Sequence, residues 1–350
     1  MRVKRIKAAG IIFCISILFL CDCGIQSPSS VDKIHIGVAY YNQSDTFLNE
    51  LVDCFKEQIN ELKDDGSSVT MTLRAASGSQ RTQDDQVKEL IDAGCNVLCV
   101  NLVDRTDPSE IIDLARENNV PVIFFNREPV TEDMMQWENL YYVGADAKQS
   151  GVMQGELATE AIHANHWIDR NKDGKIQYVV LEGEPGHQDT IIRTENAVDT
   201  LKNNGIELEK LSCGIANWSR AQAQNRMVQI INQYRNKIEL VLANNDDMAL
   251  GALDAYKKLN FTETDFPVFF GIDGTNAGLE AVLDKKLSGT VYNDKEGQAA
   301  AMAKLAVEVV SKDGTKTDAL DNDKYIYLPY SKVTTDNVNN FLNEPDASSD

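Results

Sequence analysis

Short continuous runs of Val, Ile, Leu and Phe alternate with longer amphipathic segments along most of this 350-residue chain. Such runs are typical of strands buried on both faces of a parallel sheet, and the amphipathic segments are typical of the helices that cover those faces. The alternation predicts an α/β fold, and the length suffices for two doubly wound, Rossmann-like lobes. We expect strands at residues 35–41, 69–75, 96–103, 121–126, 140–144, 177–183, 207–214, 238–244, 267–272 and 289–292. We expect helices at residues 45–62, 84–93, 108–118, 148–166, 189–203, 219–233, 246–258 and 295–311.

The N-terminus has the composition of a secretory signal peptide. Four basic residues among the first seven precede an apolar run at residues 8–21, which is too short to span a bilayer comfortably. Residues 20–24, Leu-Cys-Asp-Cys-Gly, look like a bacterial lipoprotein cleavage box, which predicts a signal peptide at residues 1–22 and a lipid anchor on Cys23. Two alternatives are a short N-terminal membrane anchor and cleavage to a free secreted protein. Residues 23–32 are expected to form a tether and residues 344–350 a disordered tail.

The chain is acidic, with 54 Asp and Glu residues against 34 Lys and Arg residues and a net charge of −20. Strong acidity disfavours binding to nucleic acid and to anionic membrane surfaces, so neither is expected as a partner. A monomer is expected. The cysteines after the leader, Cys54, Cys95, Cys99 and Cys213, have neither the spacing of a metal site nor that of a disulfide framework. Cys95 and Cys99 are expected to be buried thiols on one face of the same strand.

Polar and aromatic side chains stand where the predicted strands end. In doubly wound sheets, ligands bind at the carboxyl ends of the strands. The residues at these ends combine carboxylates, amides, an imidazole, a guanidinium and aromatic rings: Asp45, Phe47, Asn126, His187, Asp189, Arg193, Trp218, Asn245, Asp273 and Asn293. Carboxylates accept hydrogen bonds from hydroxyl groups, amides and Arg donate them, and aromatic rings can cover the apolar faces of a pyranose. The set therefore predicts a pocket for an uncharged, polyhydroxylated ligand.

Residues 169–177, Asp-Arg-Asn-Lys-Asp-Gly-Lys-Ile-Gln, have the spacing of the front half of a Ca²⁺-binding loop. Asp169, Asn171 and Asp173 carry side-chain oxygens at alternate positions, and Gly174 occupies the sixth position. An EF-hand loop has a bidentate Glu at the twelfth position, which is Val180 in this chain. The spacing predicts a structural Ca²⁺ site that lacks this carboxylate. The alternative is a polar Asx/Gly turn without a metal.

Two other groups of carboxylates have simpler interpretations. Asp246 and Asp247 begin a predicted helix, where acids are stabilised by the helix dipole. Glu128, Glu182 and Glu184 could be taken for an acid/base pair of an enzyme, but we interpret them as structural or salt-bridged residues.

Several blocks of sequence carry a resemblance that covers nearly the whole mature chain. They are Asn-Leu-Val-Asp at 101–104, Phe-Phe-Asn-Arg-Glu-Pro at 124–129, Tyr-Tyr-Val-Gly at 141–144, Gly-Glu-Pro-Gly-His at 183–187, Ala-Asn-Asn-Asp at 243–246, Ser-Gly-Thr-Val at 288–291 and Asn-Asp at 293–294. In these blocks the chain resembles the bacterial galactose/glucose-binding proteins of the periplasmic-binding-protein type I family. The resemblance implies two lobes joined by three crossings, near residues 144–145, 293–294 and 328–329. The N-terminal lobe would comprise residues 33–144 and 294–328, and the C-terminal lobe residues 145–293 and 329–343.

The resemblance also implies roles for individual residues. All ten residues at the strand ends match sugar-contacting positions of the family, with Asp45 at the hydroxyl group on carbon 4 and with Phe47 and Trp218 stacking on the ring. The Ca²⁺ ligands would be the side chains of Asp169, Asn171, Asp173 and Gln177, the backbone carbonyl of Lys175, and the side chain of Glu239 from a distant strand.

The function implied is that of an extracytoplasmic substrate-binding protein, not an enzyme. It would bind D-glucose or D-galactose between its lobes and deliver the sugar to an ABC permease, either from a lipid anchor on the outer face of the membrane or from the periplasm. A chemoreceptor is a second partner that the family implies. One alternative is the same scaffold with ribose, xylose or a signalling sugar as its ligand. Two others are a glycosidase that uses two of the carboxylates and a transcription regulator, against which the leader and the missing helix-turn-helix argue.

Overall fold

The structure, a computed structural model, describes residues 33–64, 68–310, 320 and 324–342. Its strands are β1 (Ile34–Tyr40), β2 (Val69–Ala75), β3 (Val97–Asn101), β4 (Val122–Phe125), β5 (Leu140–Ala145), β6 (Ile176–Glu182), β7 (Leu208–Ile215), β8 (Leu240–Ala243), β9 (Val268–Phe270), β10 (Thr290–Asn293), β11 (Tyr325–Leu328) and β12 (Tyr330–Val333). Its α helices are α1 (Thr46–Asp64), α2 (Gln80–Asp92), α3 (Ser109–Glu117), α4 (Thr131–Met134), α5 (Ala147–Ala164), α6 (Gln188–Asn203), α7 (Arg220–Tyr234), α8 (Asp246–Lys258), α9 (Asn276–Leu283) and α10 (Lys295–Val310).

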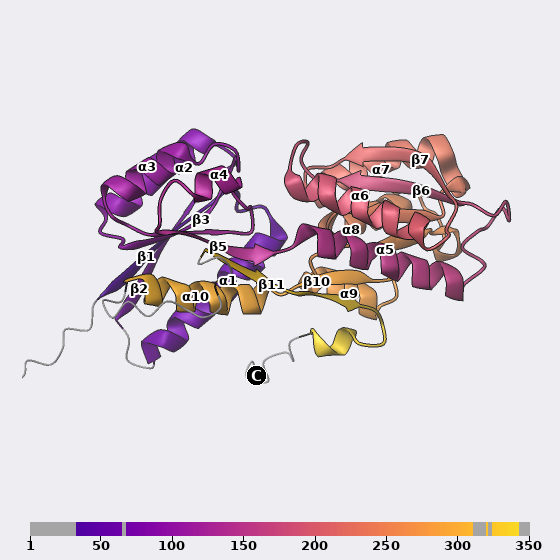
Figure 1. Cartoon of the computed structure of the whole chain (residues 1–350). Helices are drawn as coiled ribbons and strands as arrows, with labels where there is room; N and C mark the ends of the chain where they lie inside the picture. Colours follow the sequence, from indigo (N-terminus) through magenta and orange to yellow (C-terminus); the bar gives the residue numbers. More distant parts are fainter. Residues whose placement is uncertain (1–32, 65–67, 311–319, 321–323, 343–350) are drawn as a thin grey trace, which may run out of the picture. The chain divides into compact units, whose positions relative to one another are not determined.

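The strands form two parallel sheets, one in each lobe, as the alternating sequence pattern predicts (Figure 1). The first sheet has the order β11-β5-β4-β3-β1-β2, and each neighbouring pair in it is parallel. The second sheet has the order β7-β6-β8-β9, and its pairs are also parallel. In both sheets the chain winds first toward one edge and then toward the other, which is the doubly wound arrangement. The predicted fold class is therefore confirmed.

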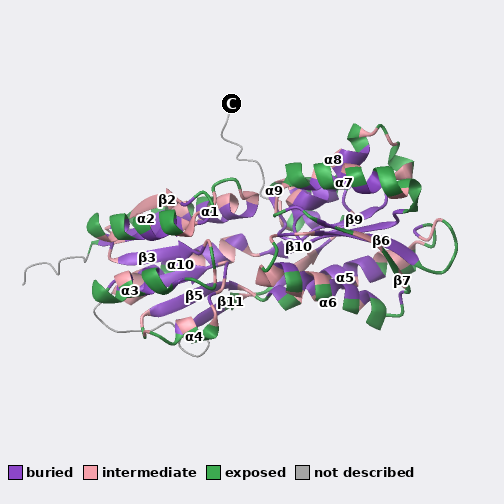
Figure 2. Ribbon diagram, turned by 90° about the horizontal axis from the view of Figure 1, so that it is seen from above, coloured by how far each residue is buried: buried purple, intermediate pink, exposed green. Residues whose placement is uncertain are grey.

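Each sheet is covered on both faces, which explains why its strands have continuous rather than alternating apolar runs. In β3, Val97 and Cys99 belong to the core on one face, while Leu98 and Val100 belong to the core on the other. In the second sheet β6 divides its side chains between two cores in the same way. Helices pack in pairs over these faces, α1 with α10, α2 with α3, α5 with α6 and α7 with α8. Strands β3, β4, β8 and β9 are accordingly buried along their whole length (Figure 2), whereas the edge strands β2 and β7 are mostly half-buried or exposed.

Three segments of chain connect the two sheets. The first leads from β5 to α5, which packs on α6 and on β9, β10 and β12. The second leads from β10 to α10, which packs on α1 and on β1, β3, β5 and β11. The third joins β11, at the edge of the first sheet, to β12, which forms an antiparallel pair with β10. This connectivity places β10 beside the second sheet, where Asp273 forms a bridge with Tyr292.

Some local predictions differ from the structure. Helix α2 begins at Gln80 rather than at residue 84, because Ser79 caps it by accepting a hydrogen bond from the backbone N–H of Thr82. Helices α4 and α9 and strands β11 and β12 were not predicted, because each has eight residues or fewer and is too short to show a clear periodicity.

The prediction that Cys95 and Cys99 share a strand face is wrong. Strand β3 begins only at Val97, so its alternation does not extend back to Cys95. Cys95 packs with the core on one face of the sheet and Cys99 with the core on the other. Cys54, Cys95, Cys99 and Cys213 are all free thiols, of which Cys95 and Cys99 are buried, as predicted.

Several predictions fall on residues that the structure does not describe. These are the signal peptide at residues 1–22, the tether at residues 23–32 with the lipidation site Cys23, and the tail at residues 344–350. Among the described residues, no helix combines the length and the apolar character that crossing a membrane requires.

Candidate functional site

Nine of the ten predicted strand-end residues line a single pocket. They are contributed by segments that follow strands of both sheets, where a doubly wound fold places its ligands. The complete lining is Tyr41, Asp45, Phe47, Asn126, Arg127, His187, Asp189, Arg193, Trp218, Asn245 and Asp273. The side chain of Asn293 does not belong to this lining, and the lining includes Tyr41 and Arg127, which were not predicted.

The segment between β1 and α1 supplies one wall of the pocket. Asp45 precedes the helix, and its Oδ1 accepts a hydrogen bond from the backbone N–H of Leu48 at 2.9 Å. Its Oδ2 accepts a hydrogen bond from the hydroxyl group of Tyr41 at 2.6 Å. Phe47, 4% exposed, packs into the core of the first lobe from the same turn. The carboxylate of Asp45 is therefore held in place by two donors, and an acceptor of this kind can receive a ligand hydroxyl.

The segment after β4 supplies a second wall, where Asn126 adopts a left-handed backbone conformation with φ of 59°. Its Oδ1 accepts a hydrogen bond from Asn101 at 3.0 Å, which fixes the side-chain amide so that its NH₂ group is free to donate elsewhere. The guanidinium of the next residue, Arg127, lies 3.6 Å from the centroid of the Tyr41 ring. It also pairs with Glu184 at 3.0 Å.

Tyr41 was missed because it was predicted to be the last residue of the strand at residues 35–41, and Arg127 because it is one residue beyond Asn126. No spacing distinguishes an arginine that lines a pocket from one that is solvated. The only sequence signal is their place directly after β1 and after Asn126, respectively.

His187 and Asp189 stand at the start of α6. His187 is the N-cap of this helix, and its Nδ1 accepts a hydrogen bond from the backbone N–H of Asp189 at 3.1 Å. Burial lowers the pKa of His187 to about 4, even though Asp189 acts in the opposite direction. The imidazole is therefore neutral at pH 7 with its proton on Nε2, which makes Nε2 a hydrogen-bond donor for a ligand.

Trp218 follows β7 in a left-handed backbone conformation with φ of 61°. Its ring packs directly over the backbone of Gly183, where any Cβ would overlap the ring carbon Cζ2. The His187 ring meets it edge to face, with centroids 5.1 Å apart. Gly183 therefore permits the close approach that brings an aromatic face to the pocket.

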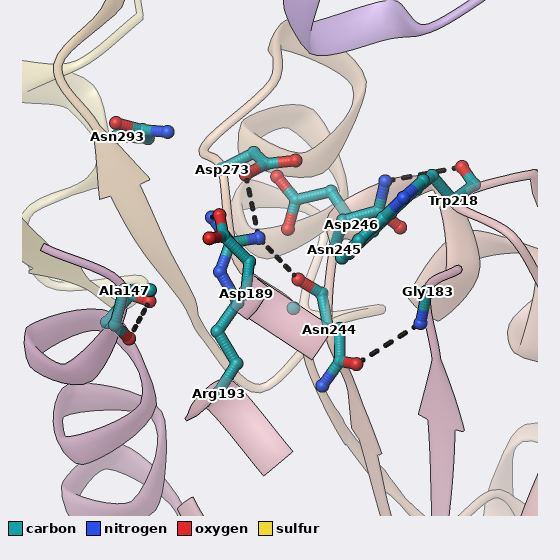
Figure 3. Close-up of polar contacts among 12 residues, drawn as sticks. Ala147, Gly183, Asp189, Arg193, Trp218, Asn244, Asn245, Asp246, Asp273 and Asn293 are labelled. Atoms are coloured by element: carbon teal, nitrogen blue, oxygen red, sulfur yellow. Dashed lines mark hydrogen bonds and ion pairs between the residues drawn. The ribbon is translucent and has the colours of Figure 1, made fainter. Parts of the chain in front are cut away.

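Arg193 is the central cation of the site and is only 4% exposed. Its Nη1 donates to the carbonyl oxygen of Asn244 at 2.8 Å and lies 3.5 Å from Oδ1 of Asp273 (Figure 3). Its Nη2 donates to the hydroxyl group of Tyr330 at 3.1 Å and lies 3.4 Å from Oδ2 of Asp189. Burial alone would lower the pKa of Arg193, but Tyr330, Asp189 and Asp273 outweigh it and raise the pKa. The guanidinium thus holds two pocket carboxylates in a fixed arrangement.

Asn245 and Asp273 follow β8 and β9. Asn245 caps α8 by accepting a hydrogen bond from the backbone N–H of Met248 at 2.9 Å, and its Nδ2 donates to the carbonyl oxygen of Trp218 at 3.3 Å (Figure 3). Burial raises the pKa of Asp273 well above its ordinary value, while Arg193 opposes that rise. The backbone N–H of Asn293 donates to the carbonyl oxygen of Asp273 at 2.9 Å. The side chain of Asn293 contacts Gln298, whose Nε2 donates to Asn293 Oδ1 at 2.7 Å.

The pocket is nearly balanced in charge, because three aspartates face two arginines. Both arginines are already paired with carboxylates, Arg127 with Glu184 and Arg193 with Asp189 and Asp273, so neither cation is free to attract an anionic ligand. What remains available is a set of oxygen acceptors, N–H donors and two aromatic rings. This combination suits a neutral ring that has several hydroxyl groups and apolar faces.

The predicted Ca²⁺ loop lies at the amino end of β6, and the pocket lies beyond its carboxyl end. Backbone N–H groups of the loop point at its side-chain oxygens. Asp173 N donates to Asn171 Oδ1 at 2.8 Å, Gly174 N to Asp169 Oδ2 at 3.0 Å, and Lys175 N to Asp173 Oδ1 at 2.9 Å. The loop is therefore wound around its predicted ligands.

Glu239, which only the family resemblance indicated, lies against this loop. It is 2% exposed, and its two oxygens accept hydrogen bonds from the backbone N–H groups of Arg170 at 2.7 Å and Gln177 at 3.0 Å. Gln177 in turn donates to Asp173 at 3.0 Å and to Glu209 at 3.1 Å. Carboxylate and amide oxygens are the kinds of ligand that Ca²⁺ prefers, but in the structure these oxygens accept hydrogen bonds from backbone N–H groups of the loop. In the described part of the chain, no group of three or more His, Cys, Asp or Glu side chains is placed to hold a metal.

Comparison with known proteins places this arrangement among solute-binding proteins. Residues 36–315 match a family described as the periplasmic binding protein domain. The D-galactose/methyl-galactoside binding periplasmic protein MglB of Haemophilus influenzae is 34% identical over 332 residues, which cover 93% of this chain and 97% of that protein. A putative rhizopine-binding protein of Rhizobium meliloti is 29% identical over 276 residues, which cover 78% of this chain and 82% of that protein. The crystal structure of an ABC transporter solute binding protein from Bacillus halodurans with bound myo-inositol has a TM-score of 0.74 and 28% identity, and covers 89% of this chain and 98% of that one.

Proposed function

Because the chain belongs to the periplasmic binding protein family, we propose that it is an extracytoplasmic sugar-binding protein of an ABC transporter with D-galactose or D-glucose as its ligand. The relatives are binding proteins rather than enzymes, and the relative with 34% identity is named for galactose and methyl-galactoside. The observation that carries the proposal is the lining of the pocket, which combines fixed acceptors, fixed donors and aromatic faces with almost no net charge.

The described geometry indicates how such a pocket holds a hexose. Asp45, Asp189 and Asp273 accept hydrogen bonds from ring hydroxyls, and His187 donates through Nε2. Arg193 keeps two of these carboxylates in position, so little entropy is lost when the sugar arrives. Phe47 and Trp218 are the residues that would cover the apolar faces of the ring.

Sugar binding is proposed to favour the arrangement of the lobes in which both contact the ligand. Asp45, Phe47 and Asn126 come from the first lobe, whereas the remaining predicted lining residues follow strands of the second. A ligand that touches both groups stabilises the state in which they face each other. We propose that an ABC permease recognises this state, and that a chemoreceptor also binds it.

The protein is further proposed to act as a monomer attached to the outer face of the membrane by a lipid on Cys23, or free in the periplasm. We also propose that the loop of Asp169, Asn171, Asp173, Lys175 and Gln177, together with Glu239, binds a structural Ca²⁺ ion. The oxygen-rich donor set and the winding of the loop around it support this site. When bound, the ion would supply structural cross-linking and no chemistry.

A comparison of thermal shifts tests which ligand the pocket binds. Thermal shifts of the purified protein are measured with D-galactose, D-glucose, D-ribose, D-xylose and myo-inositol, the last being the ligand in the Bacillus halodurans structure. The hexoses are expected to raise the melting temperature most. A larger shift with a pentose or with myo-inositol would assign the scaffold to a different ligand, and product release from an aryl galactoside would favour a glycosidase instead.

A further inference from the structure

Asp246, the first residue of α8, does not line the pocket and is completely buried. Its two carboxylate oxygens bind segments that lie far from it in the sequence. Oδ2 accepts hydrogen bonds from the backbone N–H of Thr275 at 2.8 Å and from its hydroxyl group at 3.3 Å. Oδ1 accepts a hydrogen bond from the hydroxyl group of Thr290 at 2.5 Å. One carboxylate therefore joins α8 to the start of α9 and to β10.

Two glycines leave room for this carboxylate. A Cβ at Gly271 would overlap Oδ1 of Asp246, and a Cβ at Gly278 would overlap Oδ2. The positions come from different elements, one just after β9 and the other in the first turn of α9. Since both lack a side chain where Asp246 needs space, the packing of this region is built around its carboxylate.

The sequence interpretation of Asp246 as a helix-terminal acid does not account for these contacts. The N-cap of α8 is Asn245, and the oxygens of Asp246 face Thr275 and Thr290 rather than the N–H groups of its own helix. Its neighbour Asp247 is less buried and accepts a hydrogen bond from Thr46 at 2.7 Å. An acid that only complemented the helix dipole would gain nothing from full burial, which carries a large desolvation cost.

The segment that Asp246 holds contains the pocket residue Asp273. Asp273 has φ of 114°, a conformation that residues other than glycine rarely adopt, and Gly274 follows with φ of 65°. Such a backbone persists only where its surroundings hold it firmly. On one side the backbone N–H of Asp273 donates to the carbonyl oxygen of Val291 at 2.8 Å. On the other side, two residues on, Thr275 is fixed by Asp246.

We propose that Asp246 is a positioning residue, which holds the 273–275 turn so that the Asp273 carboxylate faces the ligand. This role rests on the proposed function, because Asp273 is taken to accept hydrogen bonds from the sugar. Burial raises the pKa of Asp246 to about 7, while Thr290 and Thr275 lower it and Asp247 raises it. Burial of an acid carries a large desolvation cost, so its presence here is consistent with a role that an apolar residue could not fill.

A double-mutant cycle tests the proposal. Asp246→Ala is expected to weaken binding of D-galactose by roughly tenfold or more, because Thr275 and Thr290 lose the acceptor that holds the turn. Asp273→Asn should weaken binding strongly in the wild-type background and have little further effect in the Asp246→Ala background. Asn126→Ala, on the opposite wall of the pocket, is the control and should combine additively with Asp246→Ala. Asp246→Asn, which keeps one acceptor of similar shape, should recover part of the affinity.

Further measurements separate positioning from simple destabilisation. Leu253→Ala, in the buried face of the same helix, should lower the melting temperature and leave the affinity unchanged. Two results would overturn the proposal. One is that the losses of affinity in Asp246→Ala and Asp273→Asn add fully in the double variant, and the other is that both Asp246 variants bind with unchanged affinity. If the Ala variant does not fold, the cycle is run with Asp246→Asn.

If the proposed function is wrong, the wild-type protein will bind none of the sugars. The positioning role can still be tested in the ligand-free protein, by measuring exchange of the Thr275 amide hydrogen. This exchange should be faster in Asp246→Asn than in the wild type, because a neutral oxygen is a weaker acceptor. Equal exchange rates in the two proteins would overturn the inference.

Discussion

The ring of Trp218 lies against the backbone of Gly183 with no room for a side chain between them. We expect Gly183→Ala to displace the ring and to lower the affinity for the hexose by about tenfold, since a stacking face is lost. The backbone N–H of Gly183 donates to the side-chain oxygen Oδ1 of Asn244 at 3.2 Å, and a methyl group at position 183 does not remove this donor, so the melting temperature should change little. Isothermal titration and thermal unfolding measure the two effects.

The matched control for this prediction is Trp218→Ala. It should weaken binding at least as much as Gly183→Ala, and the double variant should bind no more weakly than Trp218→Ala alone. Additive losses would mean that position 183 affects the pocket by some route other than the ring.

Arg193→Lys should lower both the stability of the protein and its affinity for sugar, although the charge is kept. The guanidinium reaches Asn244, Tyr330, Asp189 and Asp273 at once, and an ammonium group cannot make this set of contacts. We expect a loss of roughly 2–4 kcal/mol in the free energy of unfolding, measured with urea, because buried carboxylates lose their partner. Sugar affinity should fall as well.

Arg220→Lys is the control for Arg193→Lys, since Arg220 pairs with Asp254 at 2.6 Å on the surface and is 45% exposed. Its effect on the free energy of unfolding should stay within about 0.5 kcal/mol. Equal effects at the two positions would contradict the central role given to Arg193.

The stability of the protein should depend on pH through His187. Burial lowers the pKa of His187 to about 4 in the folded protein, whereas an unfolded histidine has a pKa near 6.5. Between these values the unfolded chain binds more protons, so the free energy of unfolding should fall as the pH drops from about 6.5 toward 4. His187→Gln should reduce this slope when unfolding is followed with urea across the range. An unchanged slope would show that His187 titrates as an exposed histidine does.

Removal of Ca²⁺ is expected to lower the melting temperature without abolishing sugar binding. The loop and the pocket lie at opposite ends of β6, which has seven residues and is therefore about 20 Å long. A hundredfold excess of Ca²⁺ over its dissociation constant would stabilise the folded state by about 2.7 kcal/mol. Calorimetry with Ca²⁺ and with a chelator measures this shift, and Glu239→Gln should reduce it. Complete loss of sugar binding on chelation, with the fold intact, would be the contrary result.

The fold was predictable because both faces of each sheet are covered. Continuous apolar runs such as that of β3 arise only where both faces are buried, as Val97 and Leu98 are. Short elements such as α9 were not predictable, because eight residues carry too little periodicity. The wrong pairing of Cys95 with Cys99 has a related cause, since alternation cannot be extended past the end of a strand.

The candidate site was predictable where a polar residue ends a strand and not where the role depends on tertiary contacts. Asp273 follows β9 and was found in this way. Glu239 was indicated by family resemblance alone, since it is 62 residues from Gln177, whose backbone it binds. Asp246 looked like an ordinary helix-terminal acid, and only the positions of Thr275 and Thr290 distinguish it.

The central claim is that the pocket binds a hexose. The most direct test is isothermal titration of residues 24–350 with D-galactose and D-glucose, with D-ribose, D-xylose and myo-inositol as comparisons. We predict tight binding of at least one hexose at one site per chain, with far weaker binding of the other three ligands. No measurable binding of either hexose, together with tight binding of one of the comparison ligands, would contradict the account.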